Sequence, residues 1–196
     1  MQKMQTANQL SGRAIGVIFF AGFGAIWLSL SLYALELLHA TTLSGVLLGM
    51  AVLVLAALYL LREAKRWPRV PDDPVLSRAF NRVNVAQWIS IAVVVFALSR
   101  MHLDAFVMNA ITAIVGLHMF PLARLFRYPP HYVTGTLLVV WAAASAVIVP
   151  VEHLQGVAAL GTGTILWLSA AVTLTLALRD ARQSADSLAR ELHELN

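Results

Sequence analysis

The chain has 196 residues, of which 59% are hydrophobic and only 12% are charged, and its mean hydropathy is +0.75. Soluble domains carry about 45–50% apolar and about 25% charged residues, so the composition excludes an ordinary soluble protein and indicates a membrane protein. The formal net charge is +4. The chain has no cysteine, which excludes disulfides, thiolate metal sites, iron–sulfur clusters and cysteine nucleophiles.

The apolar residues occur in six long blocks that charged or proline-containing segments separate. A helix needs about 20 apolar residues to cross a bilayer, so the blocks predict an all-α, polytopic membrane protein with six transmembrane helices. The first block is too long for a signal-peptide core of about 7–15 residues, and we expect it to be retained. In chain order the predicted helices cover residues 14–38, 43–61, 83–99, 105–123, 132–151 and 154–178.

These helices form one predicted transmembrane domain, residues 1–178, followed by a cytoplasmic amphipathic tail, residues 179–196. The tail is predicted to extend the sixth helix. A predicted cytoplasmic loop, residues 62–82, contains three prolines, so one continuous helix is excluded there. Two aspartates stand directly before Pro74, a pattern typical of a helix start.

Glycines at GxxxG spacing predict close contacts between helices. The two pairs are Gly12 with Gly16 and Gly45 with Gly49.

Basic residues determine the predicted orientation. Thirteen of the fourteen lysines and arginines fall on the side that holds both termini, and only Arg100 falls on the other side. The positive-inside rule therefore predicts cytoplasmic N and C termini and three antiparallel helical hairpins. The same rule accounts for the net charge without nucleic acid, because the chain has no basic stripe with interleaved aromatics. The expected partners are membrane lipid and, for so small a bundle, a second copy in a homo-oligomer.

A polar cluster is predicted within the membrane, near the cytoplasmic face. His118 lies six residues, about 9 Å, before the arginine that follows its helix, and Gln87 lies five residues, about 7.5 Å, beyond the arginine that precedes its helix. Ionisable residues within spans usually face the bundle interior and mark functional sites. The alternative is a neutral histidine that joins two helices by one hydrogen bond. The predicted members are Asn84, Gln87, His118 and Thr173.

The segment "RLFRYPPHYVTG" places basic and aromatic residues around a turn that two prolines enforce. We interpret it as a cytoplasmic mouth for an anionic solute or a lipid phosphate. The alternative is the arginines and tyrosines that membrane interfaces ordinarily carry. The predicted mouth consists of Arg124, Arg127, Tyr128 and His131.

The three short loops on the outer face each combine an acid with a histidine. Imidazole and carboxylate groups bind zinc and other divalent ions, and a site with three histidines and an open position activates water. None of the loops has HExxH spacing, and interfacial anchoring is the alternative. A divalent metal is therefore one hypothesis for an otherwise unknown cofactor. The candidate ligands are His39, His102, His153, Glu36, Asp104 and Glu152.

Three segments carry a resemblance: "GRAIGVIFFAGFGAIWL" from Gly12, "NVAQWI" from Asn84 and "GLHMFPLARLF" from Gly116. Together they resemble a family of small, uncharacterised six-helix bacterial inner-membrane proteins. The resemblance implies six helices and a bacterial inner membrane, and it implies no catalytic or binding residue.

Three functions stay open from the sequence. The first is a transporter or channel-like protein for a small polar or ionic solute. The second is an intramembrane, metal-dependent enzyme with its site on the outer face, so whether the protein is an enzyme is left open. The third is a structural or regulatory membrane subunit.

Overall fold

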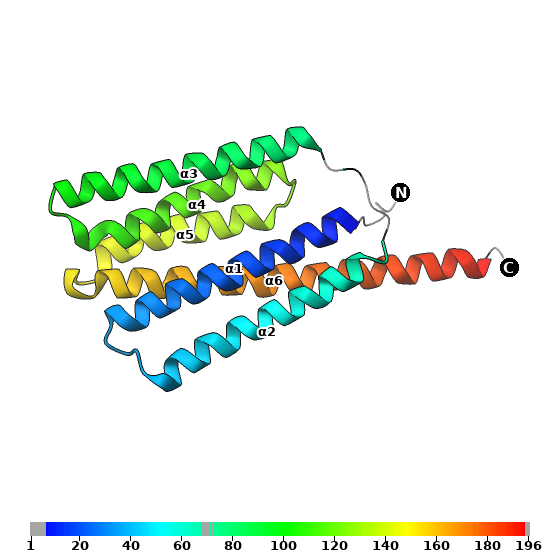
Figure 1. Ribbon diagram of the computed structural model, residues 1–196, viewed down its shortest axis with the longest axis horizontal. Coiled ribbons are helices and arrows are strands. Elements are labelled where there is room, and N and C mark those ends of the chain that lie inside the picture. Colours follow the sequence, from blue (N-terminus) through cyan, green and yellow to red (C-terminus); the bar gives the residue numbers. More distant parts are fainter. Residues whose placement is uncertain (1–6, 68–70, 72, 195–196) are drawn as a thin grey trace.

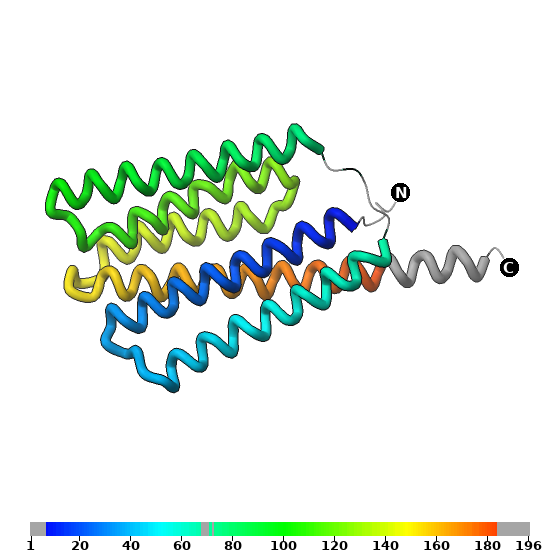
Figure 2. Tube along the Cα trace, viewed as in Figure 1, coloured from blue at the N-terminus to red at the C-terminus, as the bar shows by residue number. Residues whose placement is uncertain are grey.

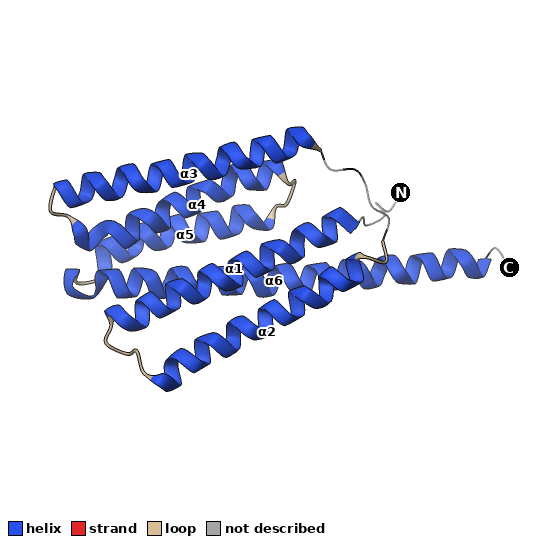
Figure 3. Cartoon of the chain, in the orientation of Figure 1, coloured by secondary structure: helices blue, strands red, loops and turns tan. Residues whose placement is uncertain are grey.

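The computed structural model describes residues 7–67, 71 and 73–194, with side chains up to Gln183. These residues form six α-helices and one short 3₁₀ helix, with no strand among them (Figures 1 and 3). The prediction of an all-helical protein with six spans is confirmed, since all six helices are long and apolar enough to cross a membrane. The elements are α1 (Ala7–Ala34), α2 (Ala40–Ala64), α3 (Pro74–Arg100), η1 (Asp104–Phe106), α4 (Val107–Leu125), α5 (Pro130–Ile148) and α6 (Val151–Glu194).

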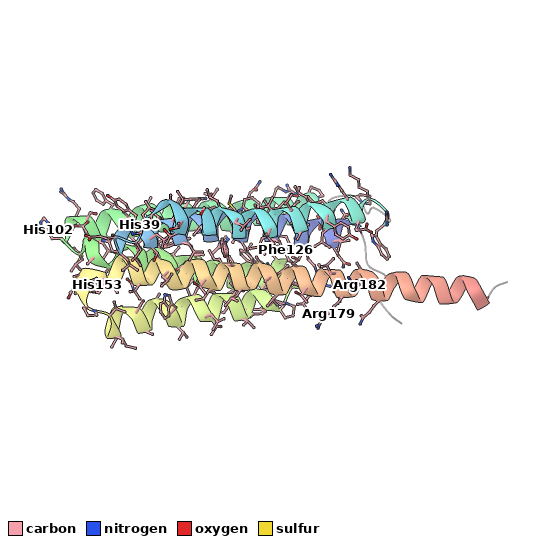
Figure 4. All side chains as sticks on the ribbon, turned by 90° about the horizontal axis from the view of Figure 1, so that it is seen from below. His39, His102, Phe126, His153, Arg179 and Arg182 are labelled. Atoms are coloured by element: carbon pink, nitrogen blue, oxygen red, sulfur yellow. The ribbon has the colours of Figure 1, made fainter. Side chains whose placement is uncertain are left out.

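The helices form an elongated bundle around α6, which contacts α1, α2, α4 and α5 (Figure 1). Helix α3 lies at the edge and packs mainly on α4. The α1–α2, α3–α4 and α5–α6 connections lie at one end of the bundle, called here the short-turn end (Figure 2). Figure 4 shows His39, His102 and His153 at this end, and Arg179 and Arg182 at the opposite end, called here the basic end.

The third helix begins earlier than its apolar block, at Pro74. The Asp73 carboxylate caps it by accepting a hydrogen bond from the backbone N–H of Val75 at 2.8 Å. Pro74 takes the first helical turn, where its missing N–H has no intrahelical partner to lose. The aspartate–proline start expected within the loop is therefore confirmed.

Two boundaries differ from the apolar blocks for identifiable reasons. Helix α1 ends at Ala34, because Glu36 has a φ of 58° and left-handed residues cannot continue a right-handed helix. Helix α6 is continuous from Val151 to Glu194, so the predicted tail continues the sixth helix up to Glu194. The side chains of the tail beyond Gln183 lie outside the described residues.

Two pairs of glycines allow neighbouring helix backbones to approach closely. A Cβ on Gly163 of α6 would lie 2.9 Å from the carbonyl oxygen of Gly24 on α1. A Cβ on Gly135 of α5 would lie 2.7 Å from the carbonyl oxygen of Gly116 on α4. The obstructing atoms belong to the backbone and cannot move aside alone, so these positions fix the α1–α6 and α4–α5 crossings.

The glycines with GxxxG spacing have a different role from the one expected. In the described part of the chain, nothing lies within 4 Å of a Cβ built on Gly12, Gly16 or Gly45. Only Gly49 is closely packed, against the ring of Trp167. The expectation of close helix contacts at Gly12, Gly16 and Gly45 is therefore wrong, because these glycines lie on faces that meet no other helix.

Trp167 of α6 fills the space between α1 and α2. Its ring atoms lie 2.3 Å from a Cβ built on Gly24 and 2.5 Å from one built on Gly49, so only glycine fits at either position. The indole Nε1 donates a hydrogen bond to the carbonyl oxygen of Ala21 at 3.0 Å. This bond satisfies the one polar atom of the ring and fixes its orientation.

Candidate functional site

Buried polar side chains gather where α4, α5 and α6 meet. Most of the buried polar residues in the described part of the chain lie on these three helices. Three hydrogen-bonded pairs, called here the polar ladder, join the helices at successive depths. The pairs are Asn109 with Ser145 at 2.8 Å, Thr112 with Thr162 at 2.7 Å and Thr134 with Ser169 at 2.9 Å. Such pairs stabilise membrane bundles by about 0.6 kcal/mol each.

Asn109→Ala is expected to lower the free energy of unfolding by about 1 kcal/mol, because two interhelical bonds of about 0.6 kcal/mol each are lost. The amide nitrogen donates to the Ala142 carbonyl at 3.0 Å and to the Ser145 hydroxyl. Unfolding of the purified protein in detergent, followed by circular dichroism, measures the loss. The control is Ser90→Ala on α3, whose hydroxyl donates to the carbonyl of Ala86 in its own helix. Equal losses in the two variants would contradict an interhelical role for Asn109.

Two histidines, called here the histidine pair, lie next to the polar ladder toward the basic end. His118 on α4 is buried and interacts with the backbone of Val83 on α3. His131 on α5 is close enough to interact electrostatically with His118. The Nδ1 atoms of both rings are buried and have no hydrogen-bond partner among the described residues.

Aromatic rings hold His131 in place. The imidazole packs edge-on against Phe20 of α1, at 5.8 Å between ring centroids, and against Tyr128, at 5.0 Å. The hydroxyl of Tyr128 donates to Thr173 on α6 at 3.3 Å. The guanidinium of Arg13 lies over the Tyr128 ring, 5.4 Å from its centroid. Four helices therefore contribute to this site. Helices α4 and α5 carry the histidine pair, and α1 and α6 place side chains against His131 or Tyr128.

An ion pair connects the site to the bundle surface. Arg13 pairs with Asp180 of α6, and their side chains are 25% and 45% exposed. Ordered from water inward, the contacts run from Asp180 to Arg13, Tyr128, His131 and His118. His118 is thus buried and His131 half-buried, and both are linked by these contacts to the exposed edge of the bundle at the basic end.

The histidine pair is chemically suited to take up one proton. A neutral imidazole has one N–H donor and one lone pair, and an unpartnered lone pair accepts either a proton or a donor group of a bound solute. The site therefore offers two buried imidazole nitrogens for a proton or for a donor group of a solute.

The predicted intramembrane cluster is only partly assembled. His118 and Thr173 both belong to the site, where Thr173 reaches the pair through Tyr128. Asn84 and Gln87 are half-buried on α3, and no hydrogen bond joins either one to another side chain in the described part of the chain. The part of α3 that reaches His118 is the backbone of Val83.

The predicted mouth divides into an inner and an outer half. Tyr128 and His131 face inward and form part of the site described above. Arg124 lines a groove between α3 and α4. Arg127 is exposed in the α4–α5 turn, where its φ of 49° is left-handed.

The candidate metal ligands have local roles in the turns at the short-turn end. No group of three or more histidine, aspartate or glutamate side chains suited to a metal occurs within the described residues. Glu36 and His102 hold left-handed turn positions, with φ of 58° and 56°. The backbone N–H of His39 donates to Thr42 at the start of α2, and the Asp104 carboxylate accepts from Ser99 at 2.7 Å. Glu152 and His153 are exposed in the first turn of α6.

Three residues of the site are absent from the sequence-based candidates: Arg13, Phe20 and Asp180. Arg13 has a signal in the sequence, since it is the basic residue that directly precedes the first apolar block, residues 14–38. Asp180 lies just beyond the predicted end of the sixth helix, in the predicted tail, and therefore does not count among the candidates within the membrane. Thr162 and Ser169 were also missed, although together with Thr173 they recur at spacings of seven and four, which place them on one face of α6.

Comparisons with known proteins find no family model, no curated protein and no solved structure that matches this chain, so its function has to be argued from its own residues.

Proposed function

We propose that the protein is a proton-linked transporter of a small polar or ionic solute in the cytoplasmic membrane, with the histidine pair as its proton site. The observation that carries this proposal is a buried and a half-buried imidazole, His118 and His131, whose Nδ1 atoms are both buried and have no partner among the described residues. Burying ionisable groups at membrane depth is costly, and in membrane proteins such groups mark proton relays and substrate paths.

The orientation is part of the proposal. The positive-inside rule supports three antiparallel hairpins with both termini in the cytoplasm, and the sequence resemblance supports a bacterial inner membrane. With the basic end in the cytoplasm, protons reach His131 past Asp180, Arg13 and Tyr128.

Helix α3 is the proposed moving element. It packs mainly on α4 and has no fully buried side chain, so a shift of α3 breaks fewer contacts than a shift of any helix that contacts α6. Such a shift would separate Val83 from His118 and bring other polar groups of α3 near the pair. Asn84 and Gln87 are the groups we propose for contact with the solute.

Proton flux into liposomes tests the proposal. Purified protein is reconstituted into liposomes that contain a pH-sensitive dye. A potassium diffusion potential drives protons inward. The measurement is made with and without a panel of amino acids, sugars and organic ions as candidate solutes. We expect flux above that of protein-free liposomes. His118→Gln and His131→Gln each keep a polar side chain but cannot titrate, and we expect each to lower the flux by about a hundredfold, as for a positioned proton-transfer group.

The matched control is His153→Gln, which alters an exposed histidine at the short-turn end. We expect its flux to equal that of the wild type. Flux no greater than in empty liposomes under every condition would contradict transport. Flux that is unchanged by both substitutions in the pair would contradict its role as the proton site.

A structural or regulatory membrane subunit is the second candidate, and a specific observation favours it. Much of the bundle interior is filled, because Trp167 packs on Gly24 and Gly49 and the Gly116–Gly135 crossing leaves no space between backbones. This candidate predicts no flux and unchanged folding in the His118→Gln variant. A homo-oligomer stays a prediction.

A further inference from the structure

A groove between α3 and α4 lies near the basic end of the bundle. It is open to the outside, has a volume of about 500 Å³ and is lined by Val83, Phe120, Pro121, Arg124 and Leu125. We call it the lipid groove. Because both helices are long and apolar enough to span the membrane, this surface faces lipid rather than water along most of its length.

The lining combines four apolar side chains with one positive charge. Arg124 is exposed and forms no ion pair or hydrogen bond through its side chain with any residue the structure describes. The lining contains no acidic residue that could pair with the ammonium group of a zwitterionic headgroup. Arginine pairs with phosphate through two parallel hydrogen bonds, so the charge of the groove favours an anionic partner.

We propose that the lipid groove binds one anionic phospholipid, with an acyl chain along the apolar lining and the phosphate on Arg124. Basic pockets between transmembrane helices are suited to such headgroups, because the apolar wall and the cation match the two parts of the molecule. Arg124 belongs to the last turn of α4, close to the basic end, where a headgroup lies when the chain is in the acyl region.

The bound lipid adds to the contact between α3 and its main neighbour, α4. Helix α3 has no fully buried side chain, and α4 is its main neighbour. A chain lying against Val83 of α3 and Phe120 of α4 adds apolar contact between them. Val83 is also the residue whose backbone meets His118, so lipid binding holds α3 in the position that keeps this contact.

Native mass spectrometry of the detergent-purified full chain tests the proposal. Titration with phosphatidylglycerol gives an apparent Kd, and phosphatidylcholine and inorganic phosphate are titrated in parallel. We expect one tightly bound phosphatidylglycerol, and a Kd about fivefold weaker in Arg124→Gln, the effect typical of one basic residue at a lipid phosphate. Arg62→Gln is the matched control, since Arg62 is exposed in the last turn of α2 and lies outside the groove.

A second variant tests the apolar part of the groove. Val83→Phe fills the groove while Arg124 stays in place, and we expect it to weaken phosphatidylglycerol binding by at least about fivefold. If this variant fails to fold, the Arg124→Gln result decides alone, since an exposed arginine without a partner supports no packing. Equal loss in Arg124→Gln and Arg62→Gln, or equal binding of phosphatidylcholine, would overturn the proposal. Displacement of the lipid by inorganic phosphate alone would overturn it in favour of a simple anion site.

Discussion

Gly24→Leu on α1 is expected to destabilise the bundle by about 3 kcal/mol or more, the upper part of the range for overpacked cores. A Cβ at this position would lie 2.3 Å from Cδ1 of Trp167 and 3.2 Å from the carbonyl oxygen of Gly163. Trp167 cannot turn away, because Gly49 lies against its other end and Ala21 accepts its N–H. The gain of about 0.8 kcal/mol in helix propensity is much smaller than this penalty.

Gly22→Leu is the matched control for this change. Gly22 is two residues away on α1, and nothing among the described residues lies within 4 Å of a Cβ built there. We expect it to leave stability unchanged or slightly higher. Thermal unfolding in detergent, followed by circular dichroism, compares the two variants. Equal destabilisation would show that α1 is sensitive to any leucine and would contradict the close α1–α6 crossing.

Trp167→Ala is expected to lower the free energy of unfolding by about 3 kcal/mol, the lower end of the range for replacing a large aromatic residue in a core. The ring packs between Gly24 and Gly49, so its removal leaves a gap among α1, α2 and α6 that two glycines cannot fill. The hydrogen bond to Ala21 is lost at the same time. Unfolding by a graded mixture of denaturing and mild detergents measures the change.

Trp88→Ala on α3 controls for the general loss of a tryptophan. Trp88 is 60% exposed and faces away from the other helices, so we expect a cost below about 1 kcal/mol. The space that Trp167→Ala leaves should also accommodate part of a leucine side chain at position 24. The double variant Gly24→Leu/Trp167→Ala is therefore expected to be more stable than the sum of the two single losses predicts. Strict additivity would contradict direct contact between these positions.

The six helices could be predicted because each apolar block is long enough to span a bilayer, a requirement that acts on every span separately. The neighbours of each helix could not be predicted in the same way. Lipid-facing and core-facing surfaces are equally apolar, so hydrophobic periodicity carries little information on rotation or pairing. Gly24 and Gly163 illustrate this, because they meet across the α1–α6 crossing although they are far apart in the sequence and belong to no shared motif.

The candidate site could be predicted in part, because membrane depth follows from counting residues along a helix. This count places His118 and Thr173 at one depth, whereas the sequence pattern assigns Tyr128 and His131 to a separate mouth. The structure joins all four in one site, since the α4–α5 turn directs Tyr128 and His131 inward. Arg13 was missed because its position among the other basic residues accounted for it by topology alone.

The pairing of the first and last helices has a consequence for biosynthesis. Helix α1 packs most extensively on α6, and α3 finds its main neighbour in α4. The ribosome releases α1 long before α6 exists, and this distant contact requires closure of nearly the whole chain. The nascent protein must therefore wait in the bilayer with the side of α1 that carries Gly24 uncovered by α6. A chain truncated before α6 leaves that face without its native partner, which makes the fragment a substrate for membrane quality control.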